Sequence, residues 1–209
     1  MQQQKSVEKV TTLKKDEKIL VVARETILKD KPFDGFLPTK NFVDEYQGLI
    51  EEHKEFLWRS EVENDLSYKQ IIPYLVFRNN GKIFVMQRKS TASETRLQSK
   101  FSLGIGGHIR EEDITNKSLF DWAAREFEEE VDYKGRFEIT PIGLINDDCN
   151  SVGQVHIGFV FLLEGDLGEI SIRDEHKSGQ MLSLEECAAI YPNMENWSQL
   201  VFDFLNKTI

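Results

Sequence analysis

The chain has 209 residues, 40% of them hydrophobic and 30% charged, with a formal net charge of -10. This length and apolar content predict one folded domain with an extension, or at most two small domains. The acidic balance argues against non-specific binding to nucleic acid polymers or anionic membranes, because both require basic patches.

The two cysteines, Cys149 and Cys187, have no metal-ligand spacing and are too few for a disulfide framework. Residues 1–30 contain no apolar run of the signal-peptide type. The longest apolar runs, at 71–77 and 155–163, are too short to span a bilayer. These features predict a cytoplasmic protein with reduced thiols and no membrane partner.

The N-terminal third begins with an apolar run at 18–26 that is typical of a strand. Residues 30–38 contain two prolines and a glycine and predict a loop. A helix capped by Thr39 or Asn41 is expected next. A stripe of mostly apolar and aromatic residues recurs along this helix at helical spacing and consists of Phe42, Tyr46, Leu49, Ile50, His53 and Leu57. We expect this stripe to pack on the domain behind it or on a second copy of the chain, so a homodimer is one candidate assembly.

The middle of the chain predicts a β-hairpin, because Asn79-Asn80-Gly81 separates two strand-like runs at 70–78 and 82–88. Strands are also expected at 136–145 and 154–163, and the second is apolar enough to be central in a sheet.

Two helices and one short strand are predicted near the C-terminus. Residues 170–172 suggest an edge strand. Ser183, with Glu186 three residues later, predicts a capping box at the start of a short helix. A final amphipathic helix is expected over 194–206.

A helix rich in glutamate precedes the strand at 136–145. Glu126, Glu129 and Glu130 lie at i, i+3 and i+4 and therefore share one face. Apolar residues form a second face, made of Phe120, Ala124, Phe127 and Val131. The acidic face can be a solvated surface in which Arg125 pairs with Glu129, or it can hold a hard divalent cation such as Mg²⁺. The upstream pair Gly106-Gly107 favours the cation, because glycines let a backbone approach a ligand closely.

This region resembles the Nudix box, G-x5-E-x7-R-E-U-x-E-E-x-G-U, in which U is a bulky apolar residue. The likeness runs from Gly107 to Tyr133, and residues 125–130 match R-E-U-x-E-E in full. Asp113 stands in place of the first glutamate, and Asp132 in place of the glycine. The spacer, residues 114–124, has eleven residues where the family has seven.

The longer spacer leads to a structural prediction. Ser118 and Asp121 form a capping-box pattern, so we expect the helix to start there and the extra residues to lengthen the loop before it. A helix that began at or before Ile114 would contradict this.

The resemblance implies an α/β fold in which a mixed β-sheet is sandwiched between helices. It covers residues 67–209 as a Nudix hydrolase domain. Residues 1–66 would then be an N-terminal α/β extension, made of a strand and an amphipathic helix.

The resemblance also implies a metal-dependent hydrolase. Water would attack a phosphorus of the diphosphate linkage in a small nucleoside diphosphate-type substrate. Glu126, Glu129 and Glu130 would hold Mg²⁺ or Mn²⁺, Glu129 would double as the base, and Arg125 would orient the carboxylates by ion pairing.

Three other positions are candidate substrate contacts. The backbone amides after Gly106 and Gly107 could face a phosphate. Arg88 stands where many Nudix proteins place an arginine that meets substrate, although it could equally close a strand at the surface.

A further carboxylate is expected outside the box. Many Nudix enzymes take one from a loop that precedes a Ser-Leu pair and a helix, and here Glu175, with Asp174 second, occupies that position. A base on a different element from the metal ligands could approach the water from the substrate side. The alternative is a solvated loop acid.

Two other functions remain open on this scaffold. A diphosphate isomerase would need a catalytic cysteine near the sheet, and a non-catalytic ligand sensor would keep the box helix for structure. Among the histidines, His108 is expected to pack the loop or contact the edge of the substrate, and His156 to be a satisfied core residue.

Overall fold

A computed structural model describes residues 16–29, 32–88, 100–113, 118–173 and 177–208. The strands among these residues are β1 Lys18–Ala23, β2 Gly35–Pro38, β3 Glu55–Trp58, β4 Tyr68–Asn79, β5 Lys82–Arg88, β6 Phe101–Ser102, β7 Ile105–Gly106, β8 Val131–Tyr133, β9 Phe137–Asn146, β10 His156–Gly165, β11 Ile170–Ile172 and β12 Lys177–Leu182. The helices are α1 Arg24–Ile27, α2 Phe42–His53, α3 Arg59–Val62, α4 Leu119–Glu130, α5 Ser151–Val155, α6 Leu184–Ile190 and α7 Asn196–Thr208, with 3-10 turns at Glu111–Asp113 and Tyr191–Asn193.

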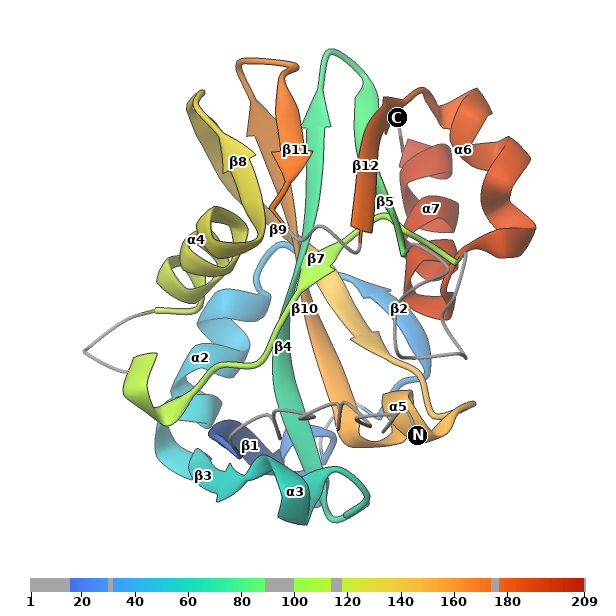
Figure 1. Ribbon diagram of the computed structural model, residues 1–209. Helices are drawn as coiled ribbons and strands as arrows, with labels where there is room; N and C mark the ends of the chain where they lie inside the picture. Colours follow the sequence, from blue (N-terminus) through green and yellow to red (C-terminus); the bar gives the residue numbers. More distant parts are fainter. Residues whose placement is uncertain (1–15, 30–31, 89–99, 114–117, 174–176, 209) are drawn as a thin grey trace, which may run out of the picture.

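A mixed sheet forms the centre of the molecule. Its strand order is β12-β5-β4-β10-β9-β2, with β1 and β7 also paired to β4, β3 to β1, and β6 to β5 (Figure 1). The long neighbours β4 and β10 run parallel, and Gln70 lies opposite His156 at the start of their register. Both strands are almost continuously buried, as expected for central strands covered on both faces. A separate small sheet pairs β8 with β11.

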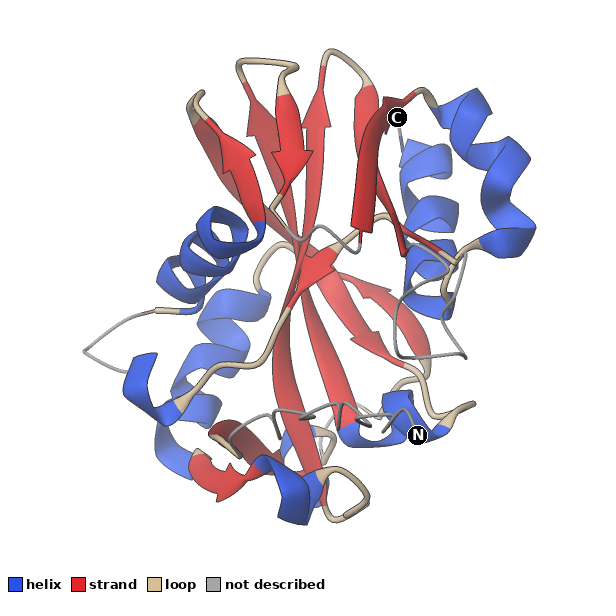
Figure 2. Cartoon of the chain, in the orientation of Figure 1, coloured by secondary structure: helices blue, strands red, loops and turns tan. Residues whose placement is uncertain are grey.

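Helices cover both faces of this sheet, which confirms the expected sandwich (Figure 2). On one face, α2 and α4 contribute Tyr46, Ile50, Trp122 and Phe127 to a core cluster. On the other face, α6 and α7 pack Cys187, Val201, Phe202 and Leu205 against β4, β5, β9 and β10. The stripe of α2 therefore packs on its own sheet, and the Tyr46 and Phe159 rings meet edge-on at 6.0 Å.

Local signals in the sequence placed several elements correctly. Asn80 and Gly81 turn the β4–β5 hairpin with φ of 48° and 76°, as a tight turn with a glycine requires. Ser183 and Glu186 form the predicted capping box of α6.

Three predictions in the N-terminal third were wrong. The strand expected over 18–26 ends at Ala23, and α1 begins at Arg24. Residues 35–38, predicted as part of a loop, form the edge strand β2, which pairs with β9. The helix predicted to reach Leu57 ends at His53, because Lys54 is extended and residues 55–58 form β3. Leu57 pairs with Ile19 of β1 instead.

The N-terminal elements belong to the same sheet as the rest of the chain. β1 pairs with β4 through Val21–Gln70 and the next two positions. β2 pairs with β9 and forms the edge of the sheet on that side. Leu20 and Val22 lie in the core cluster beneath α2 and α4. The division at residue 66 stays a prediction, and the contacts across it are extensive.

Candidate active site

The helix that contains the glutamates is α4, and it begins where the capping box predicted. The Ser118 side chain accepts from the Asp121 amide, and the Asp121 side chain accepts from the Ser118 amide. The first helical residue is Leu119, so the expected start of the helix after the long spacer is confirmed. Residues 114–117 of the spacer lie outside the described residues.

The buried side of α4 differs from the predicted apolar face. Its buried residues are Leu119, Trp122, Ala123, Glu126 and Phe127. Phe120 and Ala124 are only half-buried, and Val131 is the first residue of β8. Glu126 is therefore buried against the protein, whereas Glu129 on the same face is exposed.

The Glu126 carboxylate lies directly against the glycine turn. A Cβ atom added to Gly107 would lie 2.0 Å from its Oε1 atom, so any side chain at position 107 would displace the Glu126 carboxylate. Glu126 is 8% exposed. Burial, and then the negative charge of Glu130, raise the pKa of Glu126 to about 7. The turn and the helix thus meet at one carboxylate that is costly to ionise without a cation.

Arg125 and Arg110 link the helix to the loop before it, residues 106–113, which we call the box loop. Arg125 Nη2 lies 3.0 Å from Asp113 Oδ2, and Arg125 Nη1 lies 2.8 Å from Glu129 Oε1. Arg110 donates to Asp113 from its backbone amide and its guanidinium at 3.0–3.1 Å. Burial alone would raise the pKa of Asp113, but the Arg110 hydrogen bonds and the charge of Arg125 lower it below its usual value. Asp113 is thus an ionised link between loop and helix.

The three box glutamates differ in their surroundings. Glu129 is exposed and turned toward Arg125, with Arg110 Nη2 at 3.7 Å, while Glu130 is half-buried. Across the described residues, no three His, Cys, Asp or Glu side chains are gathered as a metal-binding group. The donor chemistry still suits a hard cation, since the face offers only carboxylate oxygens. The raised pKa of Glu126 fits a site that a cation would complete.

Strand β1 supports the box loop from outside the motif, a contact that the sequence did not reveal. The Leu20 amide donates to the Ile109 carbonyl at 2.8 Å, and Ile19 bridges to Arg110. Lys18 Nζ lies 3.5 Å from Glu111. These partners are about ninety positions apart in the chain, and no local pattern signals such a pairing.

The structure describes the surroundings of Arg88 and Glu175 only in part. Arg88 ends β5, where its backbone lies opposite Lys177 of β12, and its side chain lies outside the described set. Glu175 and Asp174 also lie outside the described residues. Arg173, two positions before Glu175, donates from its amide to the Glu130 carbonyl at 2.9 Å and from Nε to the Val131 carbonyl at 2.7 Å.

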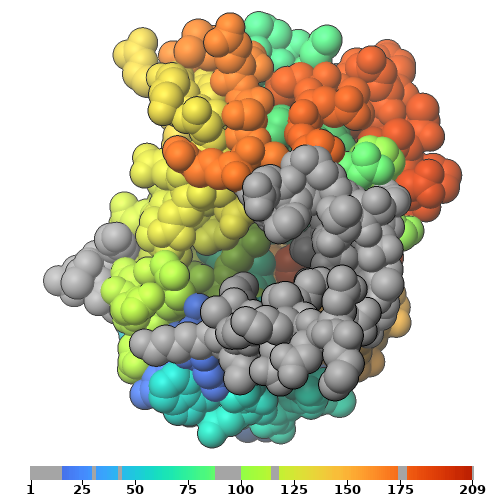
Figure 3. Space-filling model, viewed as in Figure 1, coloured from blue at the N-terminus to red at the C-terminus, as the bar shows by residue number. Residues whose placement is uncertain are grey.

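The box loop and α4 lie on one face of the molecule. Figure 3 shows the lime residues of the loop beside the yellow residues near the end of α4, at the edge of a hollow in this face. Gly106, which pairs with Tyr74 through β7, is exposed.

The replacement of the family's glycine by Asp132 needs no unusual backbone. Among the described residues, the non-glycine residue with positive φ is Asn80. Asp132 lies in the extended strand β8, and its exposed carboxylate pairs with Lys134 at 2.8 Å. This departure from the motif therefore introduces no left-handed strain after the helix.

Comparisons with known proteins agree with this arrangement. The crystal structure of Tm1382, a proposed Nudix hydrolase, matches with a TM-score of 0.79 and 32% identity, over 92% of this chain and 100% of that one. This chain belongs to the Nudix hydrolase family. It is thus a hydrolase, and the box at 107–133 is its Nudix box.

Two further relatives extend the comparison. Protein YmaB of Bacillus subtilis (strain 168) is 34% identical over 205 residues, which span 92% of this chain and 98% of that protein. The Nudix domain of Shewanella oneidensis NrtR, solved with ADP ribose, has a TM-score of 0.54 at 10% identity, covering 67% of this chain and 88% of that one, and shows a shared fold. No family model matches the chain. None of the helices in the described residues has the length and apolar content of a membrane span.

Proposed function

We propose that this protein is a divalent-metal-dependent hydrolase that cleaves a diphosphate linkage in a small nucleoside diphosphate-type substrate. The observation that carries the proposal is the Glu126 carboxylate, buried against Gly107 beside Glu130 in a complete R-E-U-x-E-E helix. A buried carboxylate whose neighbour is another carboxylate is expected to recruit a cation, and phosphate groups are commonly bound through that cation.

Each box residue has a proposed role. Glu126, Glu129 and Glu130 would hold one or more Mg²⁺ or Mn²⁺ ions, which neutralise charge on phosphate oxygens and lower the pKa of a bound water. Glu129 would also accept a proton from the attacking water. Arg125 would keep Glu129 and Asp113 in place by its ion pairs, which measure 2.8 and 3.0 Å. The amides of the Gly106-Gly107 turn would face a phosphate, with Arg88 as a further substrate contact.

Glu175 is proposed as a base contributed by a second element. The support is indirect: Arg173 ties the chain before Glu175 to the end of α4, and β12 after it pairs with the strand that contains Arg88. At saturating metal, we expect Glu175→Gln to lower kcat about a hundredfold, the lower range for loss of a general base. Unchanged metal affinity would identify a base, and weakened affinity a ligand. If kcat and metal dependence both stay at the parent values, Glu175 has no part in the site.

The cysteines give no support to the isomerase alternative. A hydrogen bond to Asp147, followed by burial, raises the pKa of the Cys149 thiol. Burial raises the pKa of Cys187 to about 11. Neither thiol is therefore a ready nucleophile at neutral pH, because the thiolate is the reactive form. Both cysteines are unpaired.

The proposed function is tested by a panel of nucleoside diphosphate derivatives with Mg²⁺ or Mn²⁺, reading nucleotide or phosphate release. We expect turnover of at least one member, loss of turnover with a chelator, and recovery with added metal. Tight binding of a panel member without turnover in either metal would favour the sensor alternative. Turnover that survives complete chelation would contradict the metal-dependent mechanism.

A further inference from the structure

The box loop is attached to the central sheet by the side chain of His108. Its Nε2 atom lies 2.7 Å from Gln70 Oε1 and 3.2 Å from His156 Nε2. Gln70 and His156 are buried and lie opposite each other on the parallel strands β4 and β10. His108 thus links the box loop to the two central strands.

The hydrogen-bond network determines which nitrogen carries each proton. His156 Nδ1 lies 2.6 Å from the Val152 carbonyl, which can only accept, so Nδ1 must donate. Burial lowers the pKa of His156 and keeps the ring neutral, which leaves Nε2 as an acceptor. Gln70 donates its Nε2 to the Val62 carbonyl, so its Oε1 also accepts. The proton between these groups therefore belongs to His108 Nε2.

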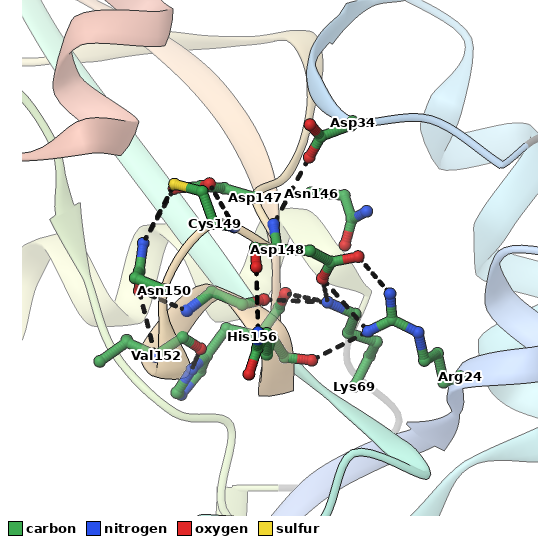
Figure 4. A network of polar contacts seen from close by, with 12 residues as sticks. Arg24, Asp34, Lys69, Asn146, Asp147, Asp148, Cys149, Asn150, Val152 and His156 are labelled. Carbon is green, nitrogen blue, oxygen red and sulfur yellow. Dashed lines mark hydrogen bonds and ion pairs between the residues drawn. The ribbon is translucent and has the colours of Figure 1, made fainter.

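The turn that carries the Val152 carbonyl is held by an ionic cluster, shown in Figure 4. The fully buried Lys69 donates to Asp148 at 3.0 Å and to the Gly153 and His156 carbonyls at 2.9 and 3.2 Å. Arg24 pairs with the same Asp148 carboxylate. The turn that contains Val152 is therefore fixed on both sides, and the orientation of His156 follows from it.

His108 directly follows Gly107, whose backbone closes over the Glu126 carboxylate. The backbone pairing of Gly106 with Tyr74 and the Leu20–Ile109 hydrogen bond hold the chain on either side of Gly107 and His108. Release of the His108 side chain would leave the turn held against Glu126 by these backbone contacts alone and would let it shift. We propose that His108, held by Gln70 and His156, is a positioning residue that keeps the Gly106-Gly107 turn against Glu126 and so sets the metal affinity of the Nudix box. This inference rests on the proposed metal-dependent function.

The test compares Mn²⁺ binding, measured by electron paramagnetic resonance, in the parent protein and in variants. Removal of a residue that orients a metal ligand typically costs 10- to 100-fold in metal affinity, and we expect His108→Ala to weaken Mn²⁺ binding by about this factor. His108→Gln should recover most of the affinity, because its amide nitrogen can take the place of Nε2. His53→Ala, at the exposed end of α2, is the matched control and should bind Mn²⁺ like the parent.

A second pair of variants separates the two contacts of His156. His156→Asn can keep the donor to Val152 but loses the acceptor for His108, so it should weaken Mn²⁺ binding. His156→Gln can keep that acceptor and should bind more tightly than His156→Asn. In the double variant His108→Ala/His156→Asn, the two losses should not add, because each breaks the same contact. If His108→Ala does not fold, the comparison of His156→Asn with His156→Gln still tests the positioning role of His108.

The outcomes distinguish this inference from the proposed function. A parent that takes up no Mn²⁺ would overturn the proposed function and this inference with it. If the parent binds Mn²⁺ and His108→Ala or His156→Asn binds it equally well, the proposed function stands and the positioning role of His108 is wrong. If His108→Ala and His108→Gln lose Mn²⁺ affinity equally, the glutamine gives no rescue, and the positioning role of His108 is again wrong.

Discussion

Replacing either Glu129 or Glu130 with glutamine is expected to lower kcat at least a hundredfold, a loss of about 3 kcal/mol in transition-state stabilisation. Each substitution removes a negative charge from the proposed metal site while keeping the size of the side chain. The loss should appear in kcat at saturating substrate and metal, because both side chains are proposed to act on the reacting groups rather than on the fold.

The expected loss can be separated from instability. Glu129 is exposed, and its ion pair with Arg125 spans one helical turn, an arrangement that contributes only about 0.3–0.5 kcal/mol. Circular dichroism should therefore show a folded Glu129→Gln protein. Glu128→Gln, exposed on the same helix, is the matched control and should keep parent activity. Full activity of Glu129→Gln with every substrate that the parent hydrolyses would end the proposed role of the box carboxylates.

Elements with strong local signals were predictable from the sequence. The Asn80-Gly81 turn, the Ser118–Asp121 capping box and the Ser183–Glu186 capping box each depend on residues within four positions of one another. Their energetics are local, so the sequence alone determines them. The helix of the Nudix box, α4, was predictable from the sequence for the same reason.

The errors occurred where distant contacts outweigh local pattern. Pro38 suggested a loop, yet proline is tolerated at the edge of a sheet, where β2 pairs with β9. Leu57 continued a helical spacing, but pairing with Ile19 draws it into β3. No glycine or proline marks the end of α2, and the basic His53 in its last turn is a weaker stop signal.

The candidate site was predictable in its residue types but not in its environment. The helical pattern gave Glu126, Glu129 and Glu130 one shared face, but it could not show that Gly107 covers Glu126. Arg110 was missed because its role depends on the turn that brings Asp113 back to it. Lys69 and Gln70, polar residues at the start of an apolar strand, were the available signal for the network that reaches His108.

In the metal-free protein, we expect the free energy of unfolding to fall as pH rises from about 4.5 to about 7, because of Glu126. Its folded pKa lies above the ordinary value for glutamate, so the folded state holds a proton that the unfolded state has released over this range. Stability is thus fully present below the range and is lost as pH rises through it. A shift of this size corresponds to a loss on the order of 3 kcal/mol.

Chemical denaturation with a chelator, at pH 4.5 and pH 7.5, measures this change. Other groups also titrate in this range, so the parent is compared with Glu126→Gln, whose side chain cannot ionise. Between the two pH values, the free energy of unfolding of Glu126→Gln should fall by about 3 kcal/mol less than that of the parent. Glu128→Gln should keep the parent dependence, because that side chain is exposed. At pH 7.5, Mn²⁺ should raise the stability of the parent, since a ligand that binds only the folded state stabilises it. An identical pH dependence in the parent and Glu126→Gln would show that the carboxylate beneath Gly107 ionises at little cost, and it would remove the reason for expecting a cation there.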